Sequence, residues 1–111
     1  MRKRSGLAST TAAAMVALAA PAHADVDTDF ADHLHGYGIY GPRDYNAWLA
    51  KITCNRLGNG TDANAETSAA FLTRNLARGT TTAQTWQFLG AAINTYCPDQ
   101  MPVLTSAAGQ H

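Results

Sequence analysis

The sequence predicts a small all-α domain, either a four-helix bundle or three long helices with one short helix, stapled by one disulfide. Four segments place apolar residues at the spacing of an amphipathic helix, and Gly, Pro, Thr and Asn are frequent in the breaks between them. No stretch alternates apolar and polar residues for long enough to indicate a β-strand. The chain holds two cysteines, Cys54 and Cys97.

The N-terminal segment, residues 1–24, is typical of a secretory signal peptide. A basic cluster at residues 2–4 precedes an Ala-rich apolar run, and the closing Ala22-His23-Ala24 offers small side chains to a signal peptidase. The apolar run is much shorter than the roughly 20 residues that cross a membrane. We therefore expect cleavage after Ala24, a secreted or otherwise extracytoplasmic product, and no stable membrane insertion after cleavage.

Cleavage would also change the charge of the chain. Residues 25–111 keep five Lys and Arg against eight Asp and Glu, so the product is mildly acidic although the whole chain is formally neutral. Nucleic acids and anionic membranes both attract clustered basic side chains, which this product lacks. The charge therefore argues against a nucleic-acid partner.

The first predicted helix covers residues 28–35 and runs into the segment DHLHGYGIYGP, residues 32–42. Phe30 and Leu34 are four residues apart, so they share one face of the helix. The glycines of the segment are expected to end the helix, and Ile39 is expected to return to the core as a hydrophobic staple.

Two histidines and two tyrosines in this segment raise the question of a haem or metal site. His33 and His35 are two residues apart, so a helix would turn them to opposite faces. Their joint use would require the chain to unwind directly after Leu34. We interpret His33, His35, Tyr37 and Tyr40 as amphipathic surface residues, with ligand binding as the alternative.

Three further helices are predicted over residues 42–57, 66–78 and 81–96. Gly58 and Gly79 are expected to close the second and third helices as left-handed caps, and a Thr-x-x-Gln capping box opens the fourth. The predicted apolar stripes of these helices are Tyr45, Trp48, Leu49 and Ile52, then Phe71, Leu72 and Leu76, and finally Trp86, Leu89 and Ile93.

These helices define one predicted domain, residues 25–102, with no visible internal repeat. Residues 103–111 are mostly small or polar and predict a flexible tail. A domain of this size buries little apolar surface, so its core alone would give marginal stability. Additional reinforcement is therefore expected.

Cys54 and Cys97 are expected to supply that reinforcement as a disulfide, because export would place them in an oxidising environment. On the chain-entropy estimate, such a bridge stabilises the fold by about 4 kcal/mol. Metal ligation by the cysteines is the alternative, but the paired C-x-x-C spacing is absent. The bridge is reachable if the second and fourth helices pack side by side in the same direction.

Trp48 and Trp86 lie on apolar stripes and are interpreted as core residues, with a small-molecule pocket walled by them as the alternative. Ser68 and Ser106 are the only serines after residue 24, and neither lies in a nucleophile elbow. The carboxylates cluster at predicted helix starts, where the helix dipole accounts for them. The sequence therefore predicts a protein that is not an enzyme, with no catalytic residues, metal or cofactor.

The order of short motifs along the chain resembles a known family. The motifs are Asp29-Phe30, Leu34, Gly38-Ile39, the Cys-x-x-Leu-Gly element at Cys54, Leu57 and Gly58, and the closing Tyr96-Cys97-Pro98. Together with the signal peptide, they are similar to the small secreted mycobacterial proteins grouped as domain of unknown function 732. The resemblance covers about residues 27–98. It implies a secreted helical domain with a Cys54–Cys97 bridge and supplies no activity.

We therefore expect a non-enzymatic extracytoplasmic binding or interaction module whose partner is a protein or a small apolar ligand. The mycobacterial secreted haemophores are also small, helical and disulfide-bearing, and this chain shares that general character with them. By this analogy, a haem or small apolar ligand carrier is the alternative function.

Overall fold

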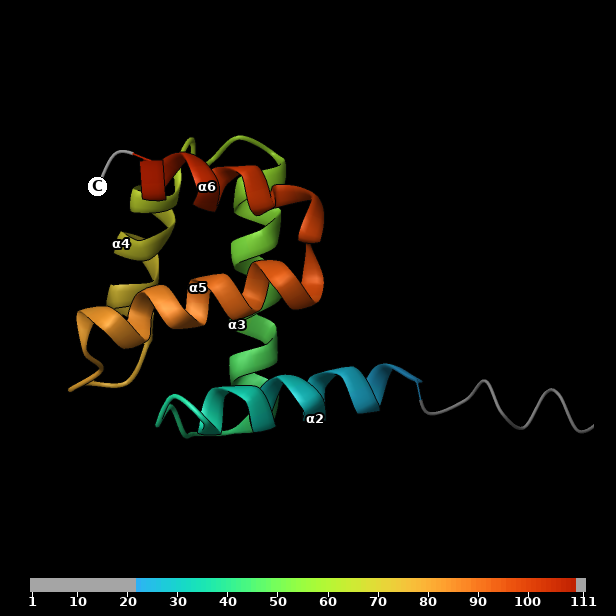
Figure 1. The fold of residues 1–111 in the computed structure, drawn as a ribbon. Coiled ribbons are helices and arrows are strands. Elements are labelled where there is room, and N and C mark those ends of the chain that lie inside the picture. The colour runs from blue at the N-terminus through green and yellow to red at the C-terminus, as the bar shows by residue number, and fades with distance from the viewer. Residues whose placement is uncertain (1–21, 110–111) are drawn as a thin grey trace, which may run out of the picture.

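The structure, a computed structural model, describes residues 22–109, which fold into five α-helices and one short 3-10 helix (Figure 1). The elements are α2 (Ala22–His35), α3 (Arg43–Gly58), α4 (Ala65–Asn75), α5 (Thr82–Tyr96), η1 (Pro98–Gln100) and α6 (Met101–Gly109). No β-strand occurs within this range, and the predicted all-α class is confirmed. Most of the predicted signal peptide, residues 1–21, lies outside the described residues.

The helices cross one another instead of aligning in one direction. In Figure 1, α3 stands upright, α2 and α5 run across it, and α6 lies across the end at which α3 finishes. Helix α5 contacts α2, α3 and α4, so it occupies the centre of the domain. The second and fourth predicted helices correspond to α3 and α5. Their expected side-by-side packing is wrong, because α5 crosses α3 (Figure 1).

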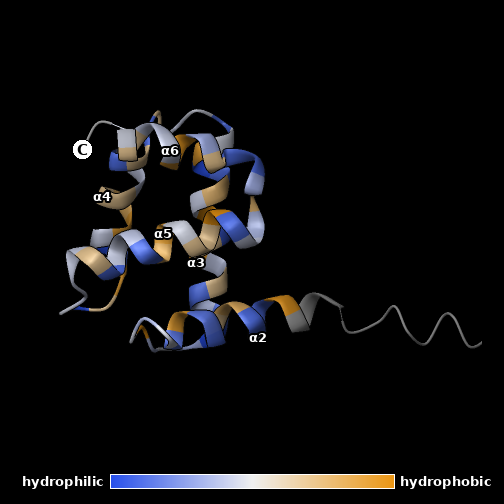
Figure 2. Ribbon diagram, viewed as in Figure 1, coloured by the Kyte–Doolittle hydropathy of each residue, from blue (hydrophilic) through white to orange (hydrophobic). Residues whose placement is uncertain are grey.

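The core forms where α2 and α5 meet. Phe30 of α2 is almost fully buried, and its ring packs edge-on against Phe88, with 5.5 Å between centroids, and Tyr96, with 5.2 Å. Such edge-to-face pairs add to the stabilisation that comes from apolar burial. Figure 2 shows apolar and hydrophilic residues mixed along each helix, as amphipathic helices require.

The glycine-rich segment after α2 is a helix-ending motif. The N–H of Gly38 donates to the carbonyl of His35 at 2.9 Å, and the N–H of Ile39 donates to that of Leu34 at 3.0 Å. Gly38 has a φ of 78°, so this is a Schellman ending with glycine in the left-handed position. Leu34 and Ile39 are both buried, as the motif's hydrophobic contact requires. The predicted helix end and the return of Ile39 to the core are confirmed.

The buried face of α3 differs from the predicted stripe. It consists of Asn46, Ala47, Leu49, Ala50, Thr53 and Leu57. Trp48 is 55% exposed and Tyr45 is 40% exposed, so the interpretation of Trp48 as a core residue is wrong. The helix is turned so that two polar residues face inward. One of them, Thr53, is satisfied because its hydroxyl donates to the carbonyl of Leu49 at 2.9 Å.

The prediction that Gly58 and Gly79 close α3 and α4 as left-handed caps is wrong. Gly58 is the last residue of α3, and Gly60 in the next turn has the positive φ, 83°. Helix α4 ends at Asn75, and Gly79 takes its φ of 91° within the following turn. Both glycines with positive φ therefore shape the connections between helices.

Residues 103–109, predicted as part of a flexible tail, belong to α6, so this prediction is wrong for the part of the tail that the structure describes. Pro102 lies in the first turn of α6, where the missing N–H of a proline costs no helical hydrogen bond. Ala107 is buried, and α6 contacts α4 and α5. The small side chains of the segment allow this close packing.

A buried carboxylate fixes the connection between α3 and α4. Asp62 is almost fully buried and accepts from Arg56 at 2.8 and 3.0 Å and from the Ser68 hydroxyl at 2.9 Å. The Arg56 guanidinium also lies 4.1 Å from the centroid of the Phe71 ring. One carboxylate thus joins the last turns of α3 to the buried face of α4.

The predicted disulfide between Cys54 and Cys97 is present, with an S–S distance of 2.05 Å and 5.8 Å between the Cα atoms. Cys54 lies in the C-terminal part of α3, and Cys97 caps α5. The bridge therefore joins the two helices at their crossing.

Candidate functional site

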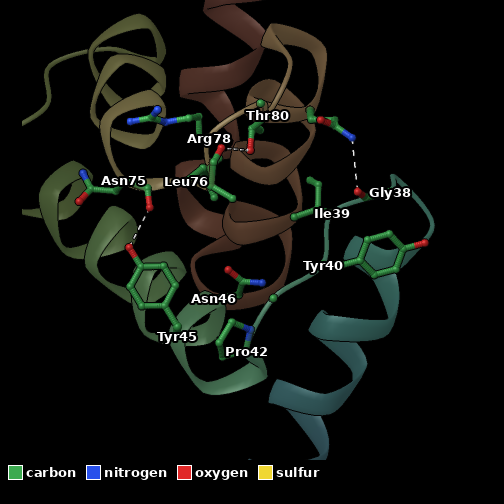
Figure 3. Close-up of a pocket in the computed structure, with 14 residues that line it drawn as sticks. Gly38, Ile39, Tyr40, Pro42, Tyr45, Asn46, Asn75, Leu76, Arg78 and Thr80 are labelled. Atoms are coloured by element: carbon green, nitrogen blue, oxygen red, sulfur yellow. Dashed lines mark hydrogen bonds between the residues drawn. The ribbon is translucent and has the colours of Figure 1, made fainter.

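A pocket of about 470 Å³ lies above the start of α3, between the segment that follows α2 and the turn that follows α4 (Figure 3). Its volume falls within the roughly 300–1,000 Å³ of known ligand pockets. We call it the amide pocket. Its lining residues are Gly38, Ile39, Tyr40, Gly41, Pro42, Tyr45, Asn46, Asn75, Leu76, Ala77, Arg78, Gly79, Thr80 and Gln84.

Asn46 is the distinctive residue of the amide pocket. It is 5% exposed, and its backbone N–H donates to the carbonyl of Pro42 at 3.1 Å, in the first turn of α3. Its side-chain amide forms no hydrogen bond with any residue that the structure describes. Figure 3 shows the amide among Tyr45, Leu76 and Ile39, facing the pocket. A buried amide left unpaired costs about 1–3 kcal/mol, so this position favours a bound partner.

Hydrogen bonds hold the walls of the pocket in place. The Tyr45 hydroxyl donates to the carbonyl of Asn75 at 2.8 Å and so ties α3 to the end of α4. The Gln84 side-chain amide donates to the carbonyl of Tyr37 at 3.1 Å. Gln84 is itself fixed, because it completes the predicted capping box with Thr81 at the start of α5. The pocket is therefore built before any ligand arrives.

Aromatic side chains are exposed at the edge of the pocket and beside it. Tyr40 is 67% exposed and lines the pocket, and the ring of Tyr45 lies 5.7 Å from that of Trp48. Exposed aromatic residues are enriched at the binding surfaces of proteins. Trp48 thus belongs to the surroundings of the candidate site and not to the core.

The histidines and tyrosines singled out in the sequence form two separate pairs. The Nε2 atom of His33 lies 3.0 Å from the Tyr37 hydroxyl oxygen, and the His35 ring lies 5.0 Å from the Tyr40 ring. His33, His35 and Tyr40 are exposed, and Tyr37 is half-buried. Within the described residues, no group of three or more His, Cys, Asp or Glu side chains is placed to hold a metal ion. Of the four residues, only Tyr40 lines the amide pocket.

Trp86 occupies a different place from Trp48. It is half-buried and lines a shallow groove of about 580 Å³ together with Glu66, Leu104, Ala107 and Ala108. This groove depends on α6, the helix that the sequence did not predict. The two tryptophans therefore do not form the shared pocket considered from the sequence.

A polar cluster joins α2 to α3 and α5. The Tyr96 hydroxyl donates to Asp27 at 2.6 Å, and the Lys51 ammonium lies 3.3 Å from the same carboxylate. The hydrogen bond from Tyr96, helped by Lys51, holds the pKa of Asp27 below its usual value of 3.8. Burial, reinforced by the hydrogen bond to Asp27, raises the pKa of Tyr96 well above its usual value of 10.0.

These shifts predict the pH dependence of stability. The contribution of Asp27 is complete above about pH 4 and is lost as pH falls through its lowered pKa. The contribution of Tyr96 is complete below about pH 10 and is lost as pH rises toward its raised pKa. Chemical denaturation from pH 3 to 11 should show both losses in the wild type, and Tyr96→Phe should abolish the alkaline loss and weaken the acid loss. Tyr40→Phe, at an exposed tyrosine, is the control, and an alkaline limb that persists in Tyr96→Phe would contradict this assignment.

No helix among residues 22–109 is both long and apolar enough to cross a membrane.

The fold and pocket define a small disulfide-bridged helical domain in which the buried Asn46 amide, without a hydrogen bond to any residue of the range 22–109, faces a ligand-sized cavity. The model of the family described as "Protein of unknown function (DUF732)" matches residues 26–99, and the chain belongs to this family. Two Mycobacterium tuberculosis proteins are each 60% identical to it over 95 residues, or 85% of both chains: "Uncharacterized protein MT0585" of strain CDC 1551 / Oshkosh and "Uncharacterized protein Rv0559c" of strain H37Rv. No solved structure matches the chain.

Proposed function

We propose that this protein is an exported, non-enzymatic binding module and that the amide pocket holds its ligand. The observation that carries the proposal is the buried amide of Asn46, which has no hydrogen-bond partner in the described domain and faces a preformed cavity. Export is supported by the signal-peptide pattern of residues 1–24 and by the disulfide, since disulfides persist in oxidising compartments.

The proposal predicts that the Asn46 amide serves binding and not folding. The substitution Asn46→Leu replaces the amide with an apolar group of similar size, so it should leave the free energy of unfolding unchanged or raise it by about 1 kcal/mol. Denaturant unfolding of the exported protein, followed by circular dichroism, measures this. A loss of more than about 1 kcal/mol would show that the amide is structural, and the site assignment would fail.

Asn64→Ala is a matched control for an asparagine that does serve folding. The Asn64 side chain accepts from the backbone N–H of Thr67 at 2.8 Å and caps the start of α4. Its removal should cost about 1 kcal/mol.

Export is checked separately by mass spectrometry of the culture medium. A chain that begins at Asp25 is expected, and an unprocessed chain retained in the cells would contradict export.

Carriage of a small apolar ligand is the alternative, supported by the groove at Trp86. The neutral fluorophore N-phenyl-1-naphthylamine is a suitable probe, because binding near Trp86 should quench tryptophan emission. Quenching that survives Asn46→Leu and Trp48→Phe but is lost in Trp86→Ala would favour this alternative over the amide pocket. Absence of quenching in the wild type would remove it.

A further inference from the structure

We infer that the ligand of the amide pocket is a short extended peptide segment, one of whose residues pairs with the Asn46 amide through its own N–H and C=O; this inference rests on the proposed function. The primary amide of Asn46 offers an N–H donor and a carbonyl acceptor in one plane. A complementary group must present an acceptor and a donor side by side, as the C=O and N–H of one residue do in an extended backbone. Arg78 is the one charged residue that lines the pocket, and Figure 3 shows its side chain directed away from Asn46, which favours an uncharged ligand group.

Gly41 leaves the space in front of this amide open. A Cβ atom added at Gly41 would lie 3.7 Å from the Asn46 side-chain nitrogen, and Gly41 has a φ of 124°, which residues with side chains rarely adopt. The glycine therefore serves both the turn into α3 and access to Asn46. A ligand backbone can approach the Asn46 amide closely because Gly41 has no side chain.

The two walls of the pocket are irregular backbone segments that can pair with an extended chain. The backbone N–H groups of Tyr40 and Gly41 on one wall, and of Arg78 and Gly79 on the other, form no hydrogen bond with any residue in the described range. Extended peptides bind by pairing with such unused backbone groups, while neighbouring pockets receive their side chains. These groups lie in the same pocket as the Asn46 amide, so a peptide could use both.

The exposed aromatic rings give a peptide side chain a surface to contact. Tyr40 and Tyr45 both line the pocket, and the Tyr45 ring is held by the hydrogen bond from its hydroxyl to Asn75. Rigid aromatic side chains at the edge of a polar pocket are common anchors in protein recognition. Backbone pairing would then determine how the segment lies, and the rings would select its side chains.

The test is an NMR titration of the ¹⁵N-labelled exported protein with N-acetyl-trialanine N-methylamide. The expected result is a saturable shift of the Asn46 side-chain resonances together with the backbone amides of Tyr40, Gly41, Arg78 and Gly79. A matched probe in which an ester replaces the amide between the first and second alanines should bind about fivefold more weakly, since its central residue lacks the N–H donor. Asn46→Leu should weaken peptide binding by about tenfold or more, and the control Asn64→Ala should bind as the wild type does.

Three results would overturn the inference: no saturable shift at Asn46, equal affinity for the amide and the ester, or a stronger response of Asn46 to maltose, a polyol probe, than to the peptide. If Asn46→Leu keeps its stability in these cases, the amide pocket remains a candidate site and only the peptide assignment fails. If Asn46→Leu is destabilised, the proposed site itself fails, whatever the probes show.

Discussion

Replacement of Cys54 and Cys97 by alanine together is expected to lower the free energy of unfolding by roughly 2–5 kcal/mol. The bridge joins residues that are 43 apart in the sequence, so the unfolded chain regains much conformational freedom once the bridge is lost. In a domain of this size, the melting temperature should fall by roughly 10–30 °C. Thermal unfolding monitored by circular dichroism measures the change.

Loss of the bridge should also affect the folded state, because the bridge lies where α5 leads into η1 and α6. Cys97 ends α5, and its carbonyl accepts from the N–H of Gln100 at 2.8 Å, so it also starts the path into η1 and α6. Hydrogen exchange should therefore rise first in residues 98–109 of the double variant. The wild type in reducing buffer is the control and should match the variant. A melting temperature that reduction leaves within a few degrees of the oxidised protein would refute the stabilising role.

The end of α2 shows what local sequence determines. Glycine at position 38 permits the positive φ of a Schellman ending, and the pair Leu34 and Ile39 brings the chain back to the core. Both features depend on residues within six positions of one another, so they could be predicted. The disulfide could be predicted for a different reason, because the chain offers one possible pair of cysteines.

The rotation of α3 shows what local sequence does not determine. Apolar spacing placed Trp48 inside, but the crossing with α2 and α5 buries Asn46 and Thr53 instead. A buried polar residue gives no signal in an apolar pattern, so the candidate site could not be predicted from Asn46. The sequence did point to Tyr40 as a possible ligand-binding residue, and this is the one predicted His or Tyr that lines the pocket.

Helix α6 was missed because its composition resembles that of a tail. Val103, Thr105, Ser106 and Gly109 have low helix propensity, so the segment predicts weak helix formation in isolation. Contact with α4 and α5 supplies the missing stability, and Ala107 is small enough to be buried there. Tertiary contacts of this kind cannot be deduced from the segment alone.

Replacement of Asp62 by alanine is expected to lower the free energy of unfolding by about 3 kcal/mol. The Asp62 side chain is fully buried in its ion pair with Arg56, and the hydroxyl of Ser68, which is also buried, donates to it. Its removal leaves the Ser68 hydroxyl without its acceptor and the guanidinium of Arg56 without its counter-ion. Both losses weaken the contact between α3 and α4, because Asp62 is the group that joins Arg56 to Ser68.

Asp44→Ala is the matched control for Asp62→Ala. Asp44 also pairs with an arginine, at 2.9 Å from Arg43, but its side chain is 82% exposed, so water replaces the lost partner and the cost should stay below about 1 kcal/mol. Urea denaturation of the two variants compares the same substitution in buried and exposed settings. Equal losses would show that burial of Asp62 adds nothing. A large loss from Asp62→Ala alone would show that one carboxylate fixes the α3–α4 connection, since the buried hydroxyl and the guanidinium depend on it for a partner.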